Sequence, residues 1–211
     1  MSSARDEVLQ RIRRANHDVA ADDPRLDHPV APEPSAAPDR QSLIDLFVER
    51  VADYRAEVTV VDPDAVAGTV ANALQGCADV VIPDGVPEQW LSEVSATQVS
   101  DDGLTATALD RIDAVVTGAA VGIAVPGTIV LDHAAGQGRR ALSLVPDLHV
   151  CVIRADQLVH DVPDGVPVLE PAVRAGRPLT WISGPSATSD IELSRVEGVH
   201  GPRTLRVVVV R

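Results

Sequence analysis

Residues 57–85 read EVTVVDPDAVAGTVANALQGCADVVIPDG, and this stretch decides the fold class. Its first six residues, EVTVVD, are rich in β-branched side chains and predict a strand. Asp62 and Pro63 are typical of the first turn of a helix. The run ADVVIPDG at residues 78–85 then predicts a second strand. A strand, a helix and a strand in succession predict a βαβ unit, in which the two strands run parallel.

The alternation continues towards the C-terminus. A helix is expected around Pro87–Val94. Further apolar runs predict strands at residues 113–118, 127–133, 148–155, 179–184 and 205–210. The run Leu148–Ile153 is apolar enough for a central strand that is buried on both faces. We therefore expect an α/β domain with a mostly parallel sheet.

The first 40 residues differ in composition from the rest. Ser3–Asn16 predicts a short helix, with acidic residues in its first turn and arginines near its end. Asp18–Asp39 contains five prolines and little periodicity, which is typical of a linker or a surface arm. An amphipathic helix with Ser42 as its N-cap is expected next, from the spacing of Leu43, Leu46, Phe47, Val51 and Tyr54. We expect a helix and proline-rich arm at residues 1–40 and an α/β domain at residues 41–211.

The balance of charge excludes several classes of function. The chain has 18 basic and 31 acidic residues, a formal net charge of -13, which disfavours binding to nucleic acids or to anionic membranes. Every basic residue is an arginine. Reactions that need a P-loop lysine, a Schiff-base lysine or a lysine general base are therefore excluded.

The chain contains only two cysteines, Cys77 and Cys151, too far apart for a CxxC motif. They cannot supply the four thiolates of an ordinary iron–sulfur centre, and we expect buried, reduced thiols. The first residues contain no apolar signal segment, and no apolar run approaches the roughly 18 residues of a membrane span. We expect a cytoplasmic protein without a metal or organic cofactor of its own.

The stretch SGPSATSDIE at residues 183–192 follows a predicted strand, and ligands of open α/β sheets bind beyond the carboxyl ends of strands. Ser189 and Glu192 form a capping box, which predicts a helix from Ser189 to about Val196. The capping box leaves four residues unexplained: Ser183, Gly184, Ser186 and Thr188. They form either a cradle for a carboxylate or phosphate or an ordinary strand-to-helix turn. Asp190 would face away from such an anion or bind a substrate hydroxyl.

A second loop, HAAGQGRRALSLVP at residues 133–146, contains the pair Gly136 and Gly138, which allows a tight turn. The third glycine of a dinucleotide fingerprint is absent. Arg139 and Arg140 open a predicted helix, where cations oppose the helix dipole. An acidic partner is therefore expected, either a ligand or a neighbouring carboxylate.

A third loop turns through Pro126 and Gly127 into a strand that starts at Thr128. Two histidines, His133 and His200, lie on the candidate loops. Neither has a second histidine at metal-ligand spacing, which favours structural roles over metal binding. We take eleven residues as candidates for ligand binding: Ser183, Gly184, Ser186, Thr188, Asp190, Gly127, Thr128, Gly136, Gly138, Arg139 and His200.

The motifs SGPSATSDIE and GVHGPR, with the element order from GTIVL onwards, resemble the lactate utilization protein C family, which carries the LUD domain. The resemblance covers about Ala114–Val210. It implies a Rossmann-like three-layer α/β/α fold, similar to the CoA transferase and ribose-phosphate isomerase group. It also implies an accessory role in the oxidation of L-lactate to pyruvate, together with separate iron–sulfur subunits. The family motifs fall on Ser183, Gly184, Pro185, Ser186, Thr188, Asp190, Ile191, Glu192 and residues 198–202.

The chain departs from the family pattern at Val125 and Pro126. Members usually carry an acidic and a hydroxyl residue there, in a place that resembles the glutamate nucleophile of CoA transferases. The departure argues against covalent acyl transfer. The alternative function is a stand-alone enzyme or binding protein for a phosphorylated or CoA-linked metabolite. The absence of lysine and of the family's glutamate argues against this alternative. Neighbouring genes for cysteine-rich iron–sulfur oxidoreductases would favour the accessory role.

Deletion of residues 1 to about 39 is expected to change thermal stability little, because this arm supplies almost no buried apolar area. The melting temperatures of the full and shortened chains test this. A decrease of more than about 8 °C, on the order of 2 kcal/mol for a domain of this size, would show that the arm belongs to the core.

Overall fold

The structure is a computed structural model that describes residues 4–15, 17, 38–185, 187–188, 196–197 and 201–211. The chain divides into two compact units, Met1–Ser35 and Ala36–Arg211. The first unit contains helix α1 (Ala4–Ala15), which buries none of its residues. Acidic side chains in its first turn and arginines in its last turn complement the helix dipole. The helix predicted at residues 3–16 is therefore present, whereas the predicted boundary at residue 40 stays a prediction.

The second unit is built on a six-stranded parallel sheet with the order β1-β12-β7-β4-β2-β3. The strands are β1 (Glu57–Val61), β2 (Asp79–Ile82), β3 (Thr97–Ser100), β4 (Ala114–Thr117), β7 (Leu148–Arg154) and β12 (Thr204–Val210). The predicted α/β class with a mostly parallel sheet is confirmed. The run at residues 148–153 lies in an inner strand, as predicted, and its residues are buried.

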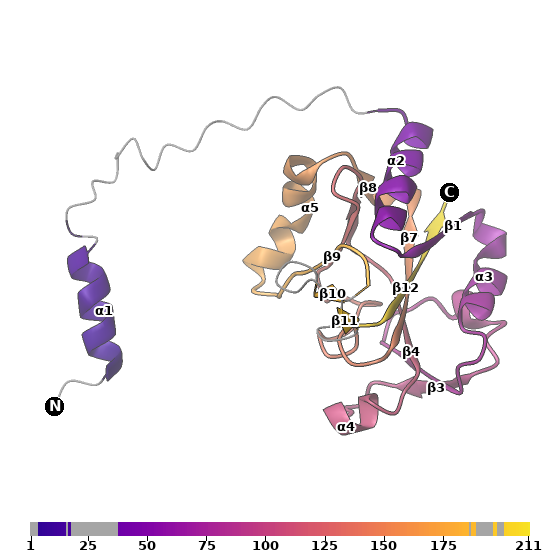
Figure 1. Ribbon diagram of the computed structural model, residues 1–211, viewed down its shortest axis with the longest axis horizontal. Helices are drawn as coiled ribbons and strands as arrows, with labels where there is room; N and C mark the ends of the chain where they lie inside the picture. The colour runs from indigo at the N-terminus through magenta and orange to yellow at the C-terminus, as the bar shows by residue number, and fades with distance from the viewer. Residues whose placement is uncertain (1–3, 16, 18–37, 186, 189–195, 198–200) are drawn as a thin grey trace. The chain divides into compact units, whose positions relative to one another are not determined.

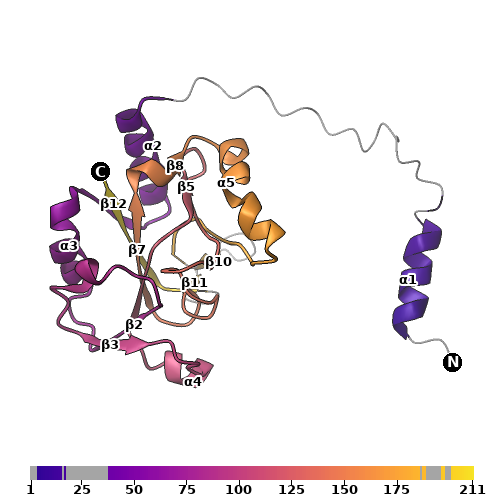
Figure 2. The ribbon, with the colours of Figure 1, turned by 180° about the vertical axis from the view of Figure 1, so that it is seen from behind.

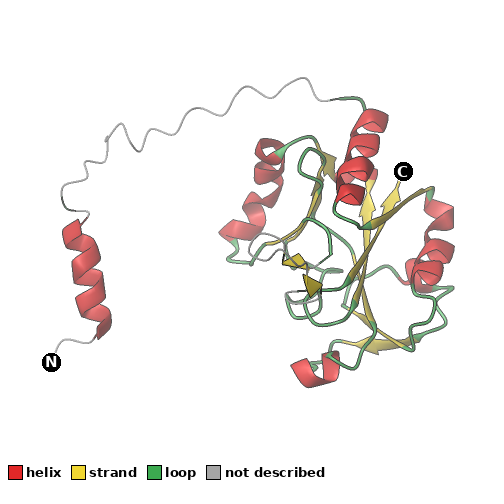
Figure 3. Cartoon of the chain, viewed as in Figure 1, coloured by secondary structure: helices red, strands yellow, loops and turns green. Residues whose placement is uncertain are grey.

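Helices cover both faces of this main sheet (Figures 1 and 3). Helix α3 (Val66–Ala73) packs on one face, in an apolar cluster with Val150 and Val208 of the central strands. Helix α2 (Arg40–Asp53) packs on the other face, where Phe47 is fully buried beside Ile153. Figure 2 shows the same division from behind. The remaining helices are α4 (Ala106–Leu109) and α5 (Val162–Arg174).

A second sheet packs beside α2. Its strands are β5 (Val121–Ile123), β6 (Thr128–Leu131), β8 (Leu158–Val159) and β9 (Thr180–Ile182), in the order β8-β5-β6-β9. Strand β6 runs antiparallel to both β5 and β9. Ile129 and Leu131 join the core beneath α2, whereas Val130 packs with Leu169 of α5. Strands β10 (Ala187–Thr188) and β11 (Val196–Glu197) form a separate antiparallel pair.

Several local predictions are wrong. The N-cap of α2 is Asp39 and not Ser42, because the Asp39 carboxylate accepts hydrogen bonds from the amides of Gln41 and Ser42. A deletion variant that begins at Asp39 would therefore keep this cap. The helix expected around Pro87–Val94 is one 3₁₀ turn at Glu88–Leu91.

The helix expected after Arg139 and Arg140 is replaced by a series of turns. Short i to i+3 bonds, such as that from the Leu142 amide to the Arg139 carbonyl, take the place of a helical ladder. The Ser143 hydroxyl also donates to the Arg140 carbonyl, and such bonds compete with helix formation.

Among the described residues, no helix combines the length and the hydropathy that crossing a bilayer requires.

The main sheet contains one buried polar pair. The Nε2 atom of His149 lies 2.7 Å from the Thr117 hydroxyl oxygen, which joins β7 to β4. His149 is only 1% exposed. Burial, and secondly the positive charge of Arg140, lower the pKa of His149 from 6.5 to about 4. The imidazole is therefore neutral at pH 7, so one ring nitrogen is a donor and the other an acceptor.

Acid should destabilise the fold through His149. In the unfolded chain His149 takes up a proton below pH 6.5, whereas in the folded chain it stays neutral until about pH 4. The unfolded state binds more protons between these values, so this residue alone should lower the free energy of unfolding by about 2 kcal/mol from pH 7 to pH 5. Urea unfolding at both pH values measures the change. The variant His149→Gln should lose this part of the pH dependence, and an equal dependence in both proteins would contradict the assignment.

Candidate functional site

The main candidate site is a small cavity between the end of β9 and the amino ends of β7 and β12, which we call the Ser183 cavity. Its volume is about 120 Å³. Two sequence motifs meet in it, because residues 183–185 of SGPS and residues 201–202 of HGPR both line it. Its lining residues are Arg140, Ser143, His149, Thr180, Trp181, Ile182, Ser183, Gly184, Pro185, Gly201, Pro202 and Leu205.

The expectation that Ser183 lies at the carboxyl edge of the main sheet is wrong. Ser183 follows β9, which belongs to the second sheet and pairs antiparallel with β6. Its loop therefore reaches the amino ends of the main strands, near Leu205. The Ser183 and Thr128 hydroxyl oxygens lie 2.7 Å apart. The structure thus brings together two candidates that are 55 residues apart in sequence.

Gly184 has a structural explanation. Its φ of +86° lies in the left-handed region, and a Cβ atom there would lie 2.5 Å from Cβ of Tyr54. Any larger residue would push the end of α2 away from the Ser183 loop. Glycine therefore sets the close approach of this loop to α2, whatever the cavity binds.

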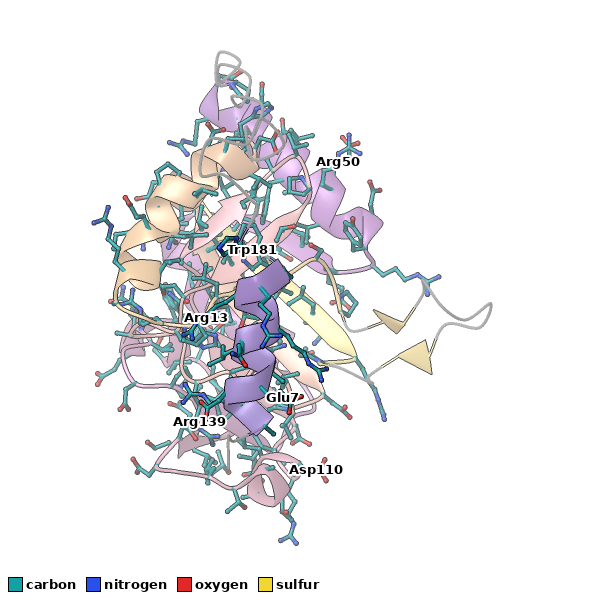
Figure 4. All side chains as sticks on the ribbon, turned by 90° about the vertical axis from the view of Figure 1, so that its left-hand side faces the viewer. Glu7, Arg13, Arg50, Asp110, Arg139 and Trp181 are labelled. Carbon is teal, nitrogen blue, oxygen red and sulfur yellow. The ribbon has the colours of Figure 1, made fainter. Side chains whose placement is uncertain are left out.

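Two neighbouring arginines have different surroundings. Arg139 makes two 2.8 Å hydrogen bonds to the Asp101 carboxylate and also donates to the Leu104 carbonyl. Arg140 donates to the Ser143 hydroxyl at 3.2 Å, and it forms no ion pair with any residue that the structure describes. In Figure 4, Arg139 lies nearer than Trp181 to the end of the body that carries Asp110. A neighbouring carboxylate thus explains the charge of Arg139, but not that of Arg140.

His149 lines the Ser183 cavity. Its Nε2 atom is paired with Thr117, whereas Nδ1 makes no hydrogen bond to a described residue. Within the described ranges, no buried side-chain nitrogen or oxygen lacks a hydrogen-bond partner. The Ser183 cavity is the open space that His149 lines.

A polar network holds the wall of the cavity. The Nδ1 atom of His133 lies 2.7 Å from the Gly138 carbonyl, and its Nε2 atom lies 2.8 Å from the Thr180 hydroxyl. Asp132 accepts hydrogen bonds from Arg177 and Gln137. Burial raises the pKa of Asp132, but these contacts, the Ala134 amide and the charge of Arg177 together outweigh burial and lower it. Asp132 is thus a structural carboxylate, and His133 connects the second loop to β9.

A larger cavity lies beyond the carboxyl ends of β2 and β3, and we call it the Asp101 cavity. Its volume is about 470 Å³, and it contains Asp84, Asp101, His133, Arg139 and Arg140. Arg140 therefore lines both cavities.

The candidate glycines 136 and 138 hold the second loop against the end of β2. The Gly136 amide donates to the Asp84 carbonyl at 2.7 Å. A Cβ atom on Gly138 would lie 2.8 Å from Cβ of Pro83. Close packing against the Gly85 backbone therefore explains Gly136, and close packing against the Pro83 and Leu142 side chains explains Gly138.

The other candidate residues lie in the turn before β6, in strand β10 or outside the described residues. Gly127 turns the chain between β5 and β6, and a Cβ atom there would lie 2.7 Å from the Arg50 carbonyl carbon. The backbone of Thr188 pairs with Val196 in β10 and β11. Val196 therefore lies in a strand, not at the end of the helix predicted from Ser189 to about Val196. The other residues of that predicted helix lie outside the described residues. Ser186, Asp190 and His200 also lie outside them.

Sequence reasoning missed His149, Thr117, Thr180 and Ser143. A signal for His149 was present, because it is the one strongly polar residue within the apolar run Leu148–Ile153. A polar residue in a strand buried on both faces needs a partner or a function. The other three carry no such signal. In the part of the chain that the structure describes, no group of three or more His, Cys, Asp or Glu residues is placed to hold a metal ion.

Comparison with known proteins identifies the family. The family model of the LUD domain matches residues 89–210. A lactate utilization protein C from Deinococcus radiodurans is 48% identical, over 99% of this chain and 96% of its own length. A lactate utilization protein C from Geobacillus kaustophilus is 25% identical, over 65% of each chain.

The fold agrees with a solved relative. The crystal structure of a DUF162 family protein from Deinococcus radiodurans has a TM-score of 0.74 and 46% identity. The match covers 82% of this chain and 99% of that chain. With a matching family model over more than half of its length and a close relative over nearly all of it, this chain belongs to the LUD domain family.

Proposed function

We propose that this protein takes part in lactate utilization and binds lactate or pyruvate in the Ser183 cavity, as an accessory subunit beside separate iron–sulfur proteins. The observation that carries the proposal is the Arg140 guanidinium, which lines a small cavity and has no carboxylate partner among the described residues. The names of the relatives from Deinococcus radiodurans and Geobacillus kaustophilus support lactate as the metabolite.

The charge of Arg140 suits a carboxylate. Burial lowers the pKa of Arg140, but an arginine remains protonated at neutral pH. Its planar fork binds a carboxylate through two parallel hydrogen bonds. The guanidinium donates a hydrogen bond to the Ser143 hydroxyl, and Ser143 is itself buried. An anion in the cavity would therefore meet an oriented, unneutralised cation.

The size of the cavity favours a small acid over a CoA-linked or nucleotide ligand. Its 120 Å³ is well below the roughly 300 Å³ at which pockets for drug-sized ligands begin. The Asp101 cavity is larger and Arg140 lines it too, but there Asp101 neutralises Arg139 and Asp84 adds a second carboxylate that disfavours an anion. The turn between β5 and β6 also lacks a carboxylate, because Val125 and Pro126 occupy it. These features support binding of a small carboxylate rather than acyl transfer.

Iron–sulfur partners are proposed because oxidation of lactate to pyruvate releases two electrons and two protons, for which an acceptor is needed. The two cysteines are suited to packing. Burial raises the pKa of the Cys151 thiol to about 12. Burial, and secondly the charge of Asp113, raise the pKa of the Cys77 thiol. Both remain protonated at neutral pH, whereas cluster ligands are thiolates.

Removal of the Arg140 charge should weaken carboxylate binding. The variant Arg140→Met keeps most of the apolar stem but loses all five donors, so the affinity for lactate and pyruvate should fall roughly 10- to 100-fold. Calorimetric titration of both acids into the purified chain measures the change. Arg154→Met is the matched control, since Arg154 pairs with Asp156 on the surface, and its affinities should stay within about twofold of wild type. Unchanged binding by Arg140→Met would show that the acid binds elsewhere.

Purification from the native host tests the partnership. We expect iron-containing subunits to co-purify with this chain, and lactate-dependent reduction of an electron acceptor to require the complex. The chain purified alone should contain no iron. Stoichiometric iron in the single chain, or lactate oxidation by the single chain at the rate of the complex, would contradict the proposal.

A further inference from the structure

We infer that His149 is a specificity residue of the Ser183 cavity, and that its Nδ1 atom hydrogen-bonds the oxygen on the α-carbon of a 2-hydroxy or 2-oxo acid. The inference rests on the proposed function, because it takes a carboxylate held by Arg140 as its starting point. It adds the substrate class: acids with an oxygen beside the carboxyl group.

The position of Nδ1 is the first argument. His149 is almost completely buried, and Thr117 fixes its ring through Nε2 at 2.7 Å. His149 lines the cavity together with Arg140 and Ser183, so we place Nδ1 towards the ligand. A ring fixed at one nitrogen presents the other in one direction, as an oriented polar group in a small site must.

The neutral state of the ring is the second argument. Arg140 lies close enough for its charge to help lower the pKa of His149, so a protonated imidazole is disfavoured beside it. Among the described lining residues, Arg140 is thus the one cation, which suits one carboxylate. A neutral imidazole recognises the next group by a hydrogen bond rather than by charge.

The pairing with Thr117 is the third argument, because a hydroxyl can either donate or accept. When Nε2 carries the ring proton, it donates to the Thr117 oxygen, and Nδ1 accepts a hydrogen bond from the hydroxyl of a 2-hydroxy acid. When the Thr117 hydroxyl donates to Nε2, Nδ1 carries the proton and donates to the keto oxygen of a 2-oxo acid. One histidine can therefore bind both lactate and pyruvate without a change in its charge.

The test compares three acids of similar size: lactate, pyruvate and propionate, which has no oxygen on the α-carbon. Calorimetric titration of the full chain at pH 7.5 should show wild type preferring lactate and pyruvate over propionate by about tenfold, as one hydrogen bond predicts. In His149→Phe this preference should fall to near unity, while the affinity for propionate stays within about threefold. His149→Asn, whose side-chain amide places a polar atom near the position of Nδ1, should keep part of the preference.

A second measurement uses the wild-type protein and so does not depend on the folding of a variant. The ¹⁵N resonances of the His149 ring report which nitrogen carries the proton. Lactate and pyruvate should move the Nδ1 resonance in opposite directions, and propionate should leave it in place.

The outcomes separate the two proposals. If none of the three acids binds, both the proposed function and this inference are wrong. If the acids bind with equal affinity, or His149→Phe keeps the wild-type preference, a carboxylate site remains but His149 does not determine its specificity. An Nδ1 resonance that responds equally to all three acids also overturns the inference.

Discussion

Burial of the central strands on both faces is the constraint on which the rest of the structure depends. Strands β7 and β12 lie between α3 on one face and α2 with the second sheet on the other, so nearly every side chain along them must be apolar. With few aromatic residues in the chain, β-branched side chains fill most of this space. Of the polar and charged residues in these two strands, His149 alone is buried, and it lies near the amino end of β7, where it lines the Ser183 cavity. Thr117 pairs with one of its nitrogens, and we propose that the other binds a ligand.

The second sheet determines where that opening lies. Strand β6 places Thr128 beside Ser183, and β9 places Thr180 beside His133. These hydroxyls are held by contacts between segments far apart in sequence, and the close approach of Gly184 to Tyr54 fixes the end of β9 against α2. The candidate site thus lies at the interface between the two sheets, rather than on a loop after a single strand.

The sequence predicts the strands of the main sheet but not this interface between the two sheets. The β-branched runs at residues 57–61, 148–153 and 205–210 predict their strands because burial on both faces leaves a continuous apolar signal. Helix α5 was missed because Pro167 and Pro171 lie inside it, and proline normally excludes a helix interior. The strands at residues 128–131 and 180–182 were expected, but their assignment to a second sheet depends on long-range pairing that no local pattern records. For the same reason Ser183 and Thr128 were proposed as parts of separate loops, and Arg139 was preferred to Arg140 before their different partners were known.

The two arginines show how the charge of the site is set. The pair looked equivalent in sequence, yet Asp101 neutralises Arg139 on the side of the Asp101 cavity and leaves Arg140 as the cation between both cavities. A cation beside a buried histidine raises the free energy of the protonated imidazole, so both burial and Arg140 act in the same direction on His149. The site therefore separates its two tasks physically. In the proposed site, charge attracts a carboxylate at Arg140, and a neutral imidazole distinguishes acids by a hydrogen bond, which charge alone could not do.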